Sequence, residues 1–128
     1  MRGSKKDLQT VEDYGEGFVS QQVEWGGMIV EISSFPAGID SSPIFRGLPD
    51  DRCQSPHWGY MLKGRMRIKY EDREEVIEEG DVYYLPPGHV PIYEQATEVV
   101  EFKDDYQKTL EVVARNMAAG PQGPRPPR

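Results

Sequence analysis

The sequence predicts a single all-β domain, built as an antiparallel sandwich or barrel and followed by one helix near the C-terminus. Three observations carry this prediction. The 128 residues include 13 glycines and 11 prolines, which divide the chain into segments too short for a helical bundle. Between residues 58 and 103, short segments with apolar alternation follow one another between turns, as in all-β sandwiches and barrels. An apolar content of 37% is enough for one core.

The strands are predicted from alternation with a period of two residues, which places successive side chains on opposite faces of a sheet. Gly26-Gly27 separates a first strand at 18–25 from a second at 28–33. Six more strands are expected at approximately 58–63, 65–70, 74–78, 81–85, 89–94 and 98–103, with breaks at glycines, prolines and polar turns.

The remaining segments carry no strand pattern. Residues 39–55 are rich in Pro, Gly, Asp and Ser, and a loop of this length in a compact domain is more often functional than idle. Asp104 or Asp105 is a candidate cap for a helix over about 105–118. We therefore expect a flexible arm at 1–16, one domain over 17–118 and a disordered Pro/Gly tail at 119–128.

The overall charge excludes several functions. With 15 basic and 22 acidic residues the net charge is −7, whereas nucleic-acid binding requires a basic face. No apolar run approaches 18 residues and the N-terminus lacks the apolar core of a secretory signal, so we expect neither a membrane span nor export. The single cysteine, Cys53, fits a reducing compartment. These features predict a cytoplasmic protein.

Most of the negative charge lies between Glu71 and Asp81, where seven acids accompany one base. The preceding strand alternates Lys63, Arg65, Arg67 and Lys69 with apolar residues. We expect the two segments to form a hairpin with opposite charges facing each other across it; an acidic docking patch is the alternative.

Two motifs resemble those of the cupin superfamily. The run from Gly80 to Gly88, which contains Pro86-Pro87, matches the first half of the second cupin motif, G-x5-P-x-G-x2-H-x3-N. The run from Tyr60 to Gly64 resembles the end of the first motif, H-x-H-x(3,4)-E-x6-G, and the 15 residues between the two motifs are typical of small bacterial cupins. The resemblance implies an RmlC-like jelly roll, that is, a double-stranded β-helix, with degenerate metal-binding motifs.

The positions where the family carries metal ligands hold other residues here. Counted from Gly64, the family's glutamate position falls on His57. Its two histidine positions fall on Asp51 and Cys53 with the three-residue spacer, and on Asp50 and Arg52 with the four-residue spacer. In the second motif the histidine position is Pro91, but His89 lies two residues earlier and faces the same side of a strand. Both histidines and the only cysteine therefore map to the inside of the barrel or beside it.

Three interpretations of these residues remain open. His57 and His89, with Cys53 and Asp51, form a rearranged site for one divalent metal, Zn or Fe rather than Mn or Ni. Alternatively, His57 or His89 is a general acid–base in a metal-free pocket, with Cys53 in its wall or, using His57 as base, as a covalent catalyst. In the third interpretation all three are structural. His57 is out of phase with the apolar alternation downstream, and a bulge at Gly59 would reconcile the two.

Aromatic side chains are the candidates for contacts with a substrate. Tyr60, Tyr93 and Trp58 are expected to line the pocket, Tyr93 because it shares strand parity with His89. The resemblance implies a barrel that binds a small organic molecule, either as a metal-dependent oxygenase, isomerase or cyclase with His57 and His89 as catalytic residues, or as a non-catalytic binding or sensing protein. It also implies a homodimer formed by exchange or pairing of edge strands, with no nucleic-acid or membrane partner.

Overall fold

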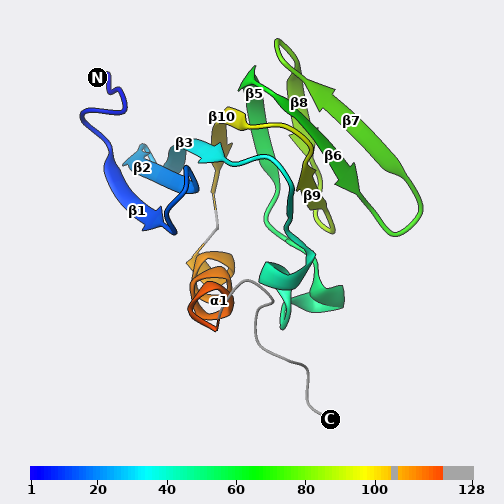
Figure 1. Ribbon diagram of the computed structural model, residues 1–128. Helices are drawn as coiled ribbons and strands as arrows, with labels where there is room; N and C mark the ends of the chain where they lie inside the picture. Colours follow the sequence, from blue (N-terminus) through cyan, green and yellow to red (C-terminus); the bar gives the residue numbers. More distant parts are fainter. Residues whose placement is uncertain (105–106, 120–128) are drawn as a thin grey trace.

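The computed structural model, which describes residues 1–104 and 107–119, consists of two antiparallel sheets and a C-terminal helix (Figure 1). The six-stranded sheet has the strand order β1 (Gln9–Asp13), β2 (Val19–Trp25), β3 (Met28–Phe35), β10 (Thr97–Lys103), β5 (His57–Lys63) and β8 (Val82–Leu85). The four-stranded sheet has the order β4 (Ile39–Asp40), β9 (Val90–Tyr93), β6 (Arg65–Lys69) and β7 (Glu74–Glu78). The predicted all-β jelly roll with one helix is confirmed.

The four-stranded sheet follows the ordinary pattern of a half-buried sheet. Its inward side chains, among them Met66, Ile68 and Ile77, pack between the sheets with Met61, Leu85 and Val99 from the six-stranded sheet. Its outward side chains include a row of charged residues, and the expected hairpin pairs Arg67 with Glu74 at 3.3 Å and Arg65 with Glu78 at 3.0 Å. The interpretation of this stretch as a charge-paired hairpin is confirmed.

The six-stranded sheet has the opposite arrangement in its central strands. On β5 the exposed residues are apolar, Trp58, Tyr60 and Leu62, whereas His57 points inward and is buried. On β10, Phe102 is exposed and Glu101 and Lys103 are buried. The interior of the barrel is therefore polar beside His57, Glu101 and Lys103, whereas Met61 and Val99 on the same two strands keep it apolar further along.

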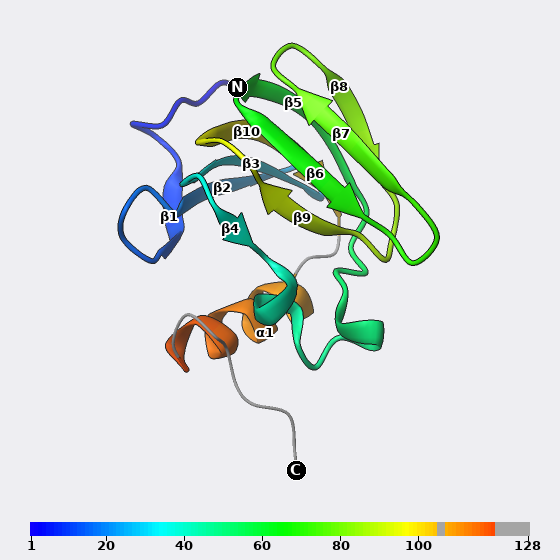
Figure 2. The same ribbon diagram turned by 45° about the vertical axis from the view of Figure 1, so that its right-hand side comes forward.

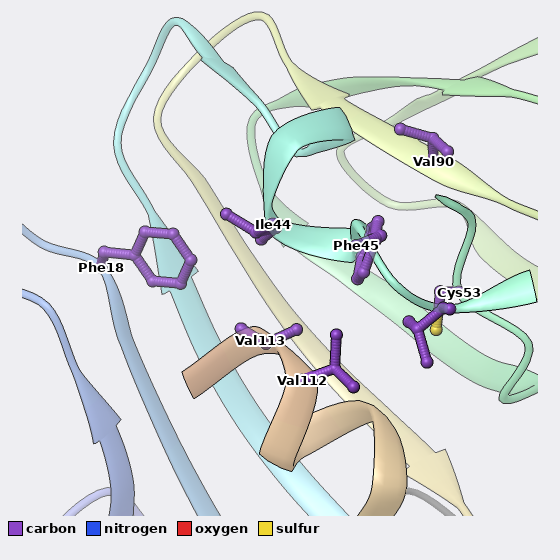
Figure 3. Close-up of a cluster of buried hydrophobic side chains, with 8 residues drawn as sticks. Phe18, Ile44, Phe45, Cys53, Val90, Val112 and Val113 are labelled. Atoms are coloured by element: carbon purple, nitrogen blue, oxygen red, sulfur yellow. The ribbon is translucent and has the colours of Figure 1, made fainter. Parts of the chain in front are cut away.

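One end of the barrel is closed by short helical segments. The 3-10 helix η1 (Ser42–Phe45) lies beside helix α1 (Gln107–Ala118) at this end, and the 3-10 helix η2 (Pro49–Asp51) follows next to η1 (Figures 1 and 2). Figure 3 shows side chains from η1 and α1 meeting at the mouth, in a cluster that comprises Phe18, Ile44, Phe45, Leu48, Cys53, Val90, Val112 and Val113. The buried amide of Asn116 ties α1 to η1 by donating to the carbonyls of Ile44 and Arg46. None of the described helices has the length and apolarity needed to cross a bilayer.

The N-terminal segment differs from the expectation of a flexible arm, because residues 9–13 form β1 against β2. The register shifts between Thr10 and Glu12, so Val11 is an extra, bulged residue. The bulge places Glu12 opposite Ser20, whose side chain is buried, and Glu12 itself is buried. Polar residues with no alternation hid this strand, since a bulge breaks the period on which the sequence argument depends.

The expected C-terminal helix is present. The helix is described from Gln107 to Ala118; residues 105–106 of the expected helix and residues 120–128 of the expected tail lie outside the described part of the chain.

The bulge expected at Gly59 is wrong, because β5 pairs with β8 in regular register from His57 to Tyr60. The irregularity lies further along, where Glu98 pairs with Lys63 and Val99 with Met61, so Leu62 is the extra residue.

Candidate functional site

Three candidate ligands come together inside the closed end of the barrel. His57 is the first residue of β5, and His89 follows the Pro86-Pro87-Gly88 turn, just before β9. Cys53 lies in the loop after η2 and forms an isolated antiparallel bridge with His89. Its amide donates to the His89 carbonyl at 3.1 Å and its carbonyl accepts from the Gly88 amide at 2.8 Å. All three side chains are buried.

The two imidazoles are oriented by hydrogen bonds from the same ring nitrogen. Nδ1 of His57 lies 3.0 Å from Oε1 of Glu101, and Nδ1 of His89 lies 2.8 Å from the carbonyl oxygen of Pro86. A carbonyl or carboxylate only accepts, so both Nδ1 atoms donate and the lone pair of each neutral ring is on Nε2. Metal-binding histidines are held in this way, by a carboxylate or a backbone carbonyl on the other nitrogen.

The distance between Cys53 and His57 suits one shared cation. Sγ of Cys53 lies 3.5 Å from Nε2 of His57. Two ligands of one tetrahedral zinc ion, at about 2.3 Å for sulfur and about 2.0 Å for nitrogen, are roughly 3.5 Å apart. One ligand atom from each of Cys53, His57 and His89 lies within 4.8 Å of the others, and the two rings meet edge to face with centroids 4.7 Å apart. The chemistry of a thiolate with two imidazoles fits Zn²⁺ or Fe²⁺.

A network of buried charged side chains orients His57 through its contact with Glu101. Oε2 of Glu101 accepts a 2.6 Å hydrogen bond from the Tyr83 hydroxyl, and Oε1 of the same carboxylate lies 3.4 Å from Nζ of Lys103. Lys103, only 1% exposed, also donates to Glu31 at 2.7 Å. Glu31 and Glu101 are direct cross-strand partners, so the single positive charge of Lys103, in contact with both, reduces the repulsion between the two acids.

The electrostatics favour a Cys53 thiolate beside a His57 imidazolium, and a cation bound at Nε2 would take the place of the imidazolium proton. Burial alone would raise the pKa of the Cys53 thiol, but hydrogen bonds to His57 and His89 and the charges of both rings lower it to about 5. Burial and Lys103 would lower the pKa of His57, and Glu101 and Cys53 outweigh them and raise it. Burial would raise the pKa of Glu101, but His57 and Lys103 hold it well below its usual range.

These groups face a small enclosed cavity of about 40 Å³. Cys53, His57, His89, Glu101 and Lys103 line one side of it, and Phe18, Ile44 and Val113 close it toward the mouth. Tyr93 also lines the cavity and its ring stacks on Phe35 at 4.0 Å. Glu12 brings a further carboxyl to the wall. A space of this size holds a few water molecules.

Three residues expected at the site lie elsewhere. Trp58 and Tyr60 are 45% and 42% exposed on the outer face of β5, because neighbours of the inward-facing His57 on a strand point outward. Asp51 ends η2 on the surface, where its carboxylate accepts from the Gly47 amide. The expectation failed for Asp51 because η2 interrupts the extended conformation that would have given it the direction of Cys53.

Sequence reasoning missed the supporting residues Glu31, Glu101, Lys103, Tyr83 and Glu12. A charged residue on a strand is ordinarily a surface residue, so the sequence gives no reason to place Glu31 or Glu101 inside the barrel. One signal was present on β10, where apolar Val100 and Phe102 alternate with Glu101 and Lys103. The two faces of this strand therefore differ in polarity, and a polar barrel interior would be compatible with the charged face pointing inward.

Comparison with known proteins places the chain in context. The family described as the AraC-like ligand binding domain matches residues 39–103, which include all three candidate ligands. No curated protein sequence matches the chain.

Among solved structures, the chain is similar to an RmlC-like cupin from Shewanella frigidimarina NCIMB 400, with 13% identity and a TM-score of 0.59 over 83% of this chain and 92% of that one. It is similar to KdgF from Halomonas sp., with 13% identity and a TM-score of 0.58 over 82% and 95%. A mutant oxalate decarboxylase from Bacillus subtilis aligns at 18% identity and a TM-score of 0.55, over 80% of this chain but 29% of that chain. At these identities the similarity shows the fold alone, and the fold is that of the cupins.

Proposed function

Because this chain belongs to the family of AraC-like ligand-binding domains, within the cupin superfamily, we propose that its barrel holds one divalent metal ion and binds a small organic molecule beside it. Fold alone does not decide between such functions. The observation that carries the proposal is the orientation of the two histidines, each held through Nδ1 with Nε2 left for a cation, next to the Cys53 thiolate.

The metal would be held by Sγ of Cys53 and by Nε2 of His57 and His89, with Zn²⁺ or Fe²⁺ as the ions that fit this donor set. Three protein ligands are the number found in catalytic zinc sites, which keep one position for water or substrate. Glu101 takes the role of the carboxylate that orients a ligating histidine. A free thiol ligand also fits a reducing compartment such as the cytoplasm.

The bound metal would supply Lewis acidity toward an oxygen atom of the ligand. The chain's own residues set the conditions around it. Tyr83 and Lys103 hold the Glu101 carboxylate in place from two sides, and Glu101 keeps the proton of His57 on Nδ1. Phe18, Ile44 and Val113 exclude bulk water from the cavity, which strengthens each electrostatic contact inside it.

The cavity limits what is bound. A space of about 40 Å³ takes the polar end of an organic molecule and not the whole of one, since ligand pockets are typically about 300–1,000 Å³. A groove of about 510 Å³ adjoins it on the outside and shares Phe18 and Ile44 with the cavity wall. Movement of these two side chains would join the two spaces, so that the ligand's oxygen-bearing end enters the cavity while its body lies in the groove.

By this reasoning the site serves a metal-dependent oxygenase, isomerase or cyclase, with His57 and His89 as the central residues and Tyr93 in the pocket wall. The alternative is a non-catalytic, metal-free binding or sensing protein. The observation in its favour is the charge already inside the barrel, because Lys103, Glu31 and Glu12 line the cavity and provide polar contacts for a ligand without a metal.

The test is titration of the metal-stripped protein with Co²⁺, which reports its ligands by absorption. We expect one equivalent to bind, with visible bands of a low-symmetry site and a thiolate-to-cobalt charge-transfer band in the near ultraviolet. Cys53→Ser should lose the charge-transfer band, and the double variant His57→Ala/His89→Ala should lose binding. Elemental analysis of the protein as purified then identifies the resident metal.

Asp51→Asn is the matched control, since Asp51 is a nearby acid that the structure places on the surface; it should bind Co²⁺ as the parent does. Absence of stoichiometric Co²⁺ binding by the folded parent protein would contradict the metal site. Binding of small organic molecules by that same metal-free protein would then favour the alternative.

A further inference from the structure

Glu12 brings into the barrel a carboxyl group that the proposed metal site does not use. It follows the bulge at Val11 on β1 and lines the same cavity of about 40 Å³ as the three candidate ligands. Bulges re-aim side chains in this way next to functional sites. Its cross-strand partner Ser20 is small and also lines the cavity, with its hydroxyl 2.9 Å from that of Ser33. The Glu12 carboxyl group therefore adjoins the open space inside the barrel.

The surroundings of Glu12 do not compensate a negative charge. Lys103 contacts Glu31 at 2.7 Å and Glu101 at 3.4 Å, so one ammonium group already serves two carboxylates. Among the residues that the structure describes, no basic side chain forms an ion pair with Glu12, and an unpaired buried charge is costly. Burial accordingly raises the pKa of Glu12 to about 7, against the lowering effect of its hydrogen bond from Tyr14.

The groups around Glu12 determine which of its oxygens carries the proton. The Tyr14 hydroxyl donates to Oε2 at 2.9 Å, so the proton of the acid is on Oε1. Beyond burial and Tyr14, the pKa of Glu12 responds to Glu31 on β3, which raises it, and to Lys103 on β10, which lowers it. The Ser20 hydroxyl on β2 is a further neighbour. Because a hydroxyl accepts as well as donates, Ser20 is compatible with the protonated acid.

Tyr93 on β9 links Glu12 with the candidate metal ligands. It is buried and lines the cavity. Burial raises the pKa of Tyr93 well above its usual value, and the charges of the carboxyl groups around the cavity, Glu12 among them, and of Cys53 raise it further. The Tyr93 hydroxyl is therefore within electrostatic range of both Cys53 and Glu12. The candidate metal ligands and Glu12 thus share one space, which is small enough for a single polar group to fill.

We propose that Glu12 selects a carboxylate as the group bound beside the metal, by donating a hydrogen bond from its acid form to one carboxylate oxygen while the other faces the metal. The inference rests on the proposed function and names its ligand class, a small carboxylate. A carboxylate offers two equivalent oxygens, one for a cation and one for an acid proton, and a hydrogen bond from an acid to a carboxylate is charge-assisted and strong. Ionised Glu12 repels the same group, so the affinity falls when Glu12 loses its proton.

The experiment is titration of the Co²⁺-loaded protein with acetate at pH 6 and pH 8, on either side of the pKa of Glu12, followed by the change in the visible absorption bands. Glu12→Gln is the test variant, because the amide keeps the size of the side chain and donates at both pH values. From pH 6 to pH 8 the acetate affinity of the parent should fall about tenfold relative to that of Glu12→Gln, since binding requires the Glu12 proton. The ratio cancels the titration of metal-bound water, which both proteins share.

Acetamide gives a second measurement that needs no variant. It has the size of acetate without the charge, so ionisation of Glu12 should weaken its binding less. In the parent protein the preference for acetate over acetamide should therefore fall about tenfold from pH 6 to pH 8.

Asp13→Asn is the matched control, because Asp13 is the next residue on β1 and its side chain is exposed; its acetate affinity should follow that of the parent at both pH values. If either ratio is the same at pH 6 and pH 8, or if acetate leaves the Co²⁺ bands unchanged, the proposal is overturned. These results leave the metal site standing, since they are measured on protein that holds Co²⁺. Absence of Co²⁺ binding by the folded parent would instead overturn the proposed metal site and this inference together.

Discussion

The two sheets of this barrel distribute polarity in opposite ways. The four-stranded sheet keeps Met66, Ile68 and Ile77 inside and its arginines and glutamates outside. The central strands of the six-stranded sheet keep Glu31, Glu101 and Lys103 inside and a tryptophan, two tyrosines and a phenylalanine outside. Outside the bulges at Val11 and Leu62 the side chains of both sheets alternate along each strand, so the difference lies in which residues occupy the inward positions.

The difference separates the tasks of the two sheets. Charges inside a barrel cost desolvation, and they are retained where they are paired and hydrogen-bonded, as Lys103 is between Glu31 and Glu101. The six-stranded sheet thereby provides the oriented ring of His57 and the Glu101 carboxylate that accepts a hydrogen bond from it. The ordinary sheet contributes packing and a charged, solvated surface. The candidate site is therefore built from the sheet that departs from the usual hydrophobic pattern.

The strongest test of this comparison removes one charge from each sheet. Lys103→Met leaves Glu31 and Glu101 facing each other without the buried ammonium that contacts both, and we expect the free energy of unfolding to fall by about 3–5 kcal/mol. Arg67→Met on the ordinary sheet should change stability little, because exposed ion pairs contribute weakly. Urea denaturation of both variants measures the loss in free energy of unfolding, and equal losses in the two variants would contradict the distinction between the sheets.

A second test uses the acid that the Val11 bulge brings into the barrel. Burial raises the pKa of Glu12 from 4.5 to about 7, so folding favours its protonated form. The stabilisation that the fold gains from this difference in pKa is fully present below pH 4.5. It is lost as the pH rises through 7, a loss of about 3 kcal/mol in the free energy of unfolding. In Glu12→Gln this loss is absent, and the variant should gain stability over the parent between pH 5 and pH 8.

The measurement for Glu12 is the difference in unfolding free energy between variant and parent at each pH. Glu24→Gln, an exposed acid on the neighbouring strand β2, is the control, and its curve should run parallel to that of the parent. A Glu12→Gln curve that also runs parallel would mean that Glu12 is ionised throughout and that its burial has no effect on proton binding.

The smallest expected effect concerns Gly59 on β5 of the six-stranded sheet. A methyl group on Gly59 would collide with the ring of its cross-strand partner Tyr83, whose hydroxyl donates to Glu101. Gly59→Ala should cost about 1–3 kcal/mol and weaken Co²⁺ binding, because Tyr83 must shift away from Glu101. In the double variant Gly59→Ala/Tyr83→Ala the alanine should cost nothing further; if the cost persists, the collision is not its cause.

Much of the fold is predictable from the sequence, because glycines and prolines bound the strands. Six strands between 58 and 103 were expected, and the structure has β5 to β10 there with bounds shifted by one residue or so. Strand β1 was not predictable in the same way, since the Val11 bulge interrupts its alternation. The direction in which β5 faces was also missed, because Tyr60 and Leu62 are apolar and yet exposed.

The candidate site was predictable only in its outline. The motif spacing brought Cys53, His57 and His89 to one place in the barrel, and the structure holds their ligand atoms within 4.8 Å. It also suggested Asp51, which local backbone conformation removes from the site. The network behind His57 depends on pairings between strands distant in sequence, such as Glu31 with Glu101, and a single sequence does not contain that register.

The cap formed by α1 and η1 has a consequence for kinetics. The amide of Asn116 fastens α1 to η1, and Ile44, Phe45 and Val113 stand between the cavity and solvent. A molecule larger than a few waters reaches Cys53 and the histidines only when this cap opens. If the barrel binds a ligand as proposed, the frequency of opening limits the association rate to below the diffusion limit, and the same barrier slows release and lengthens the residence time.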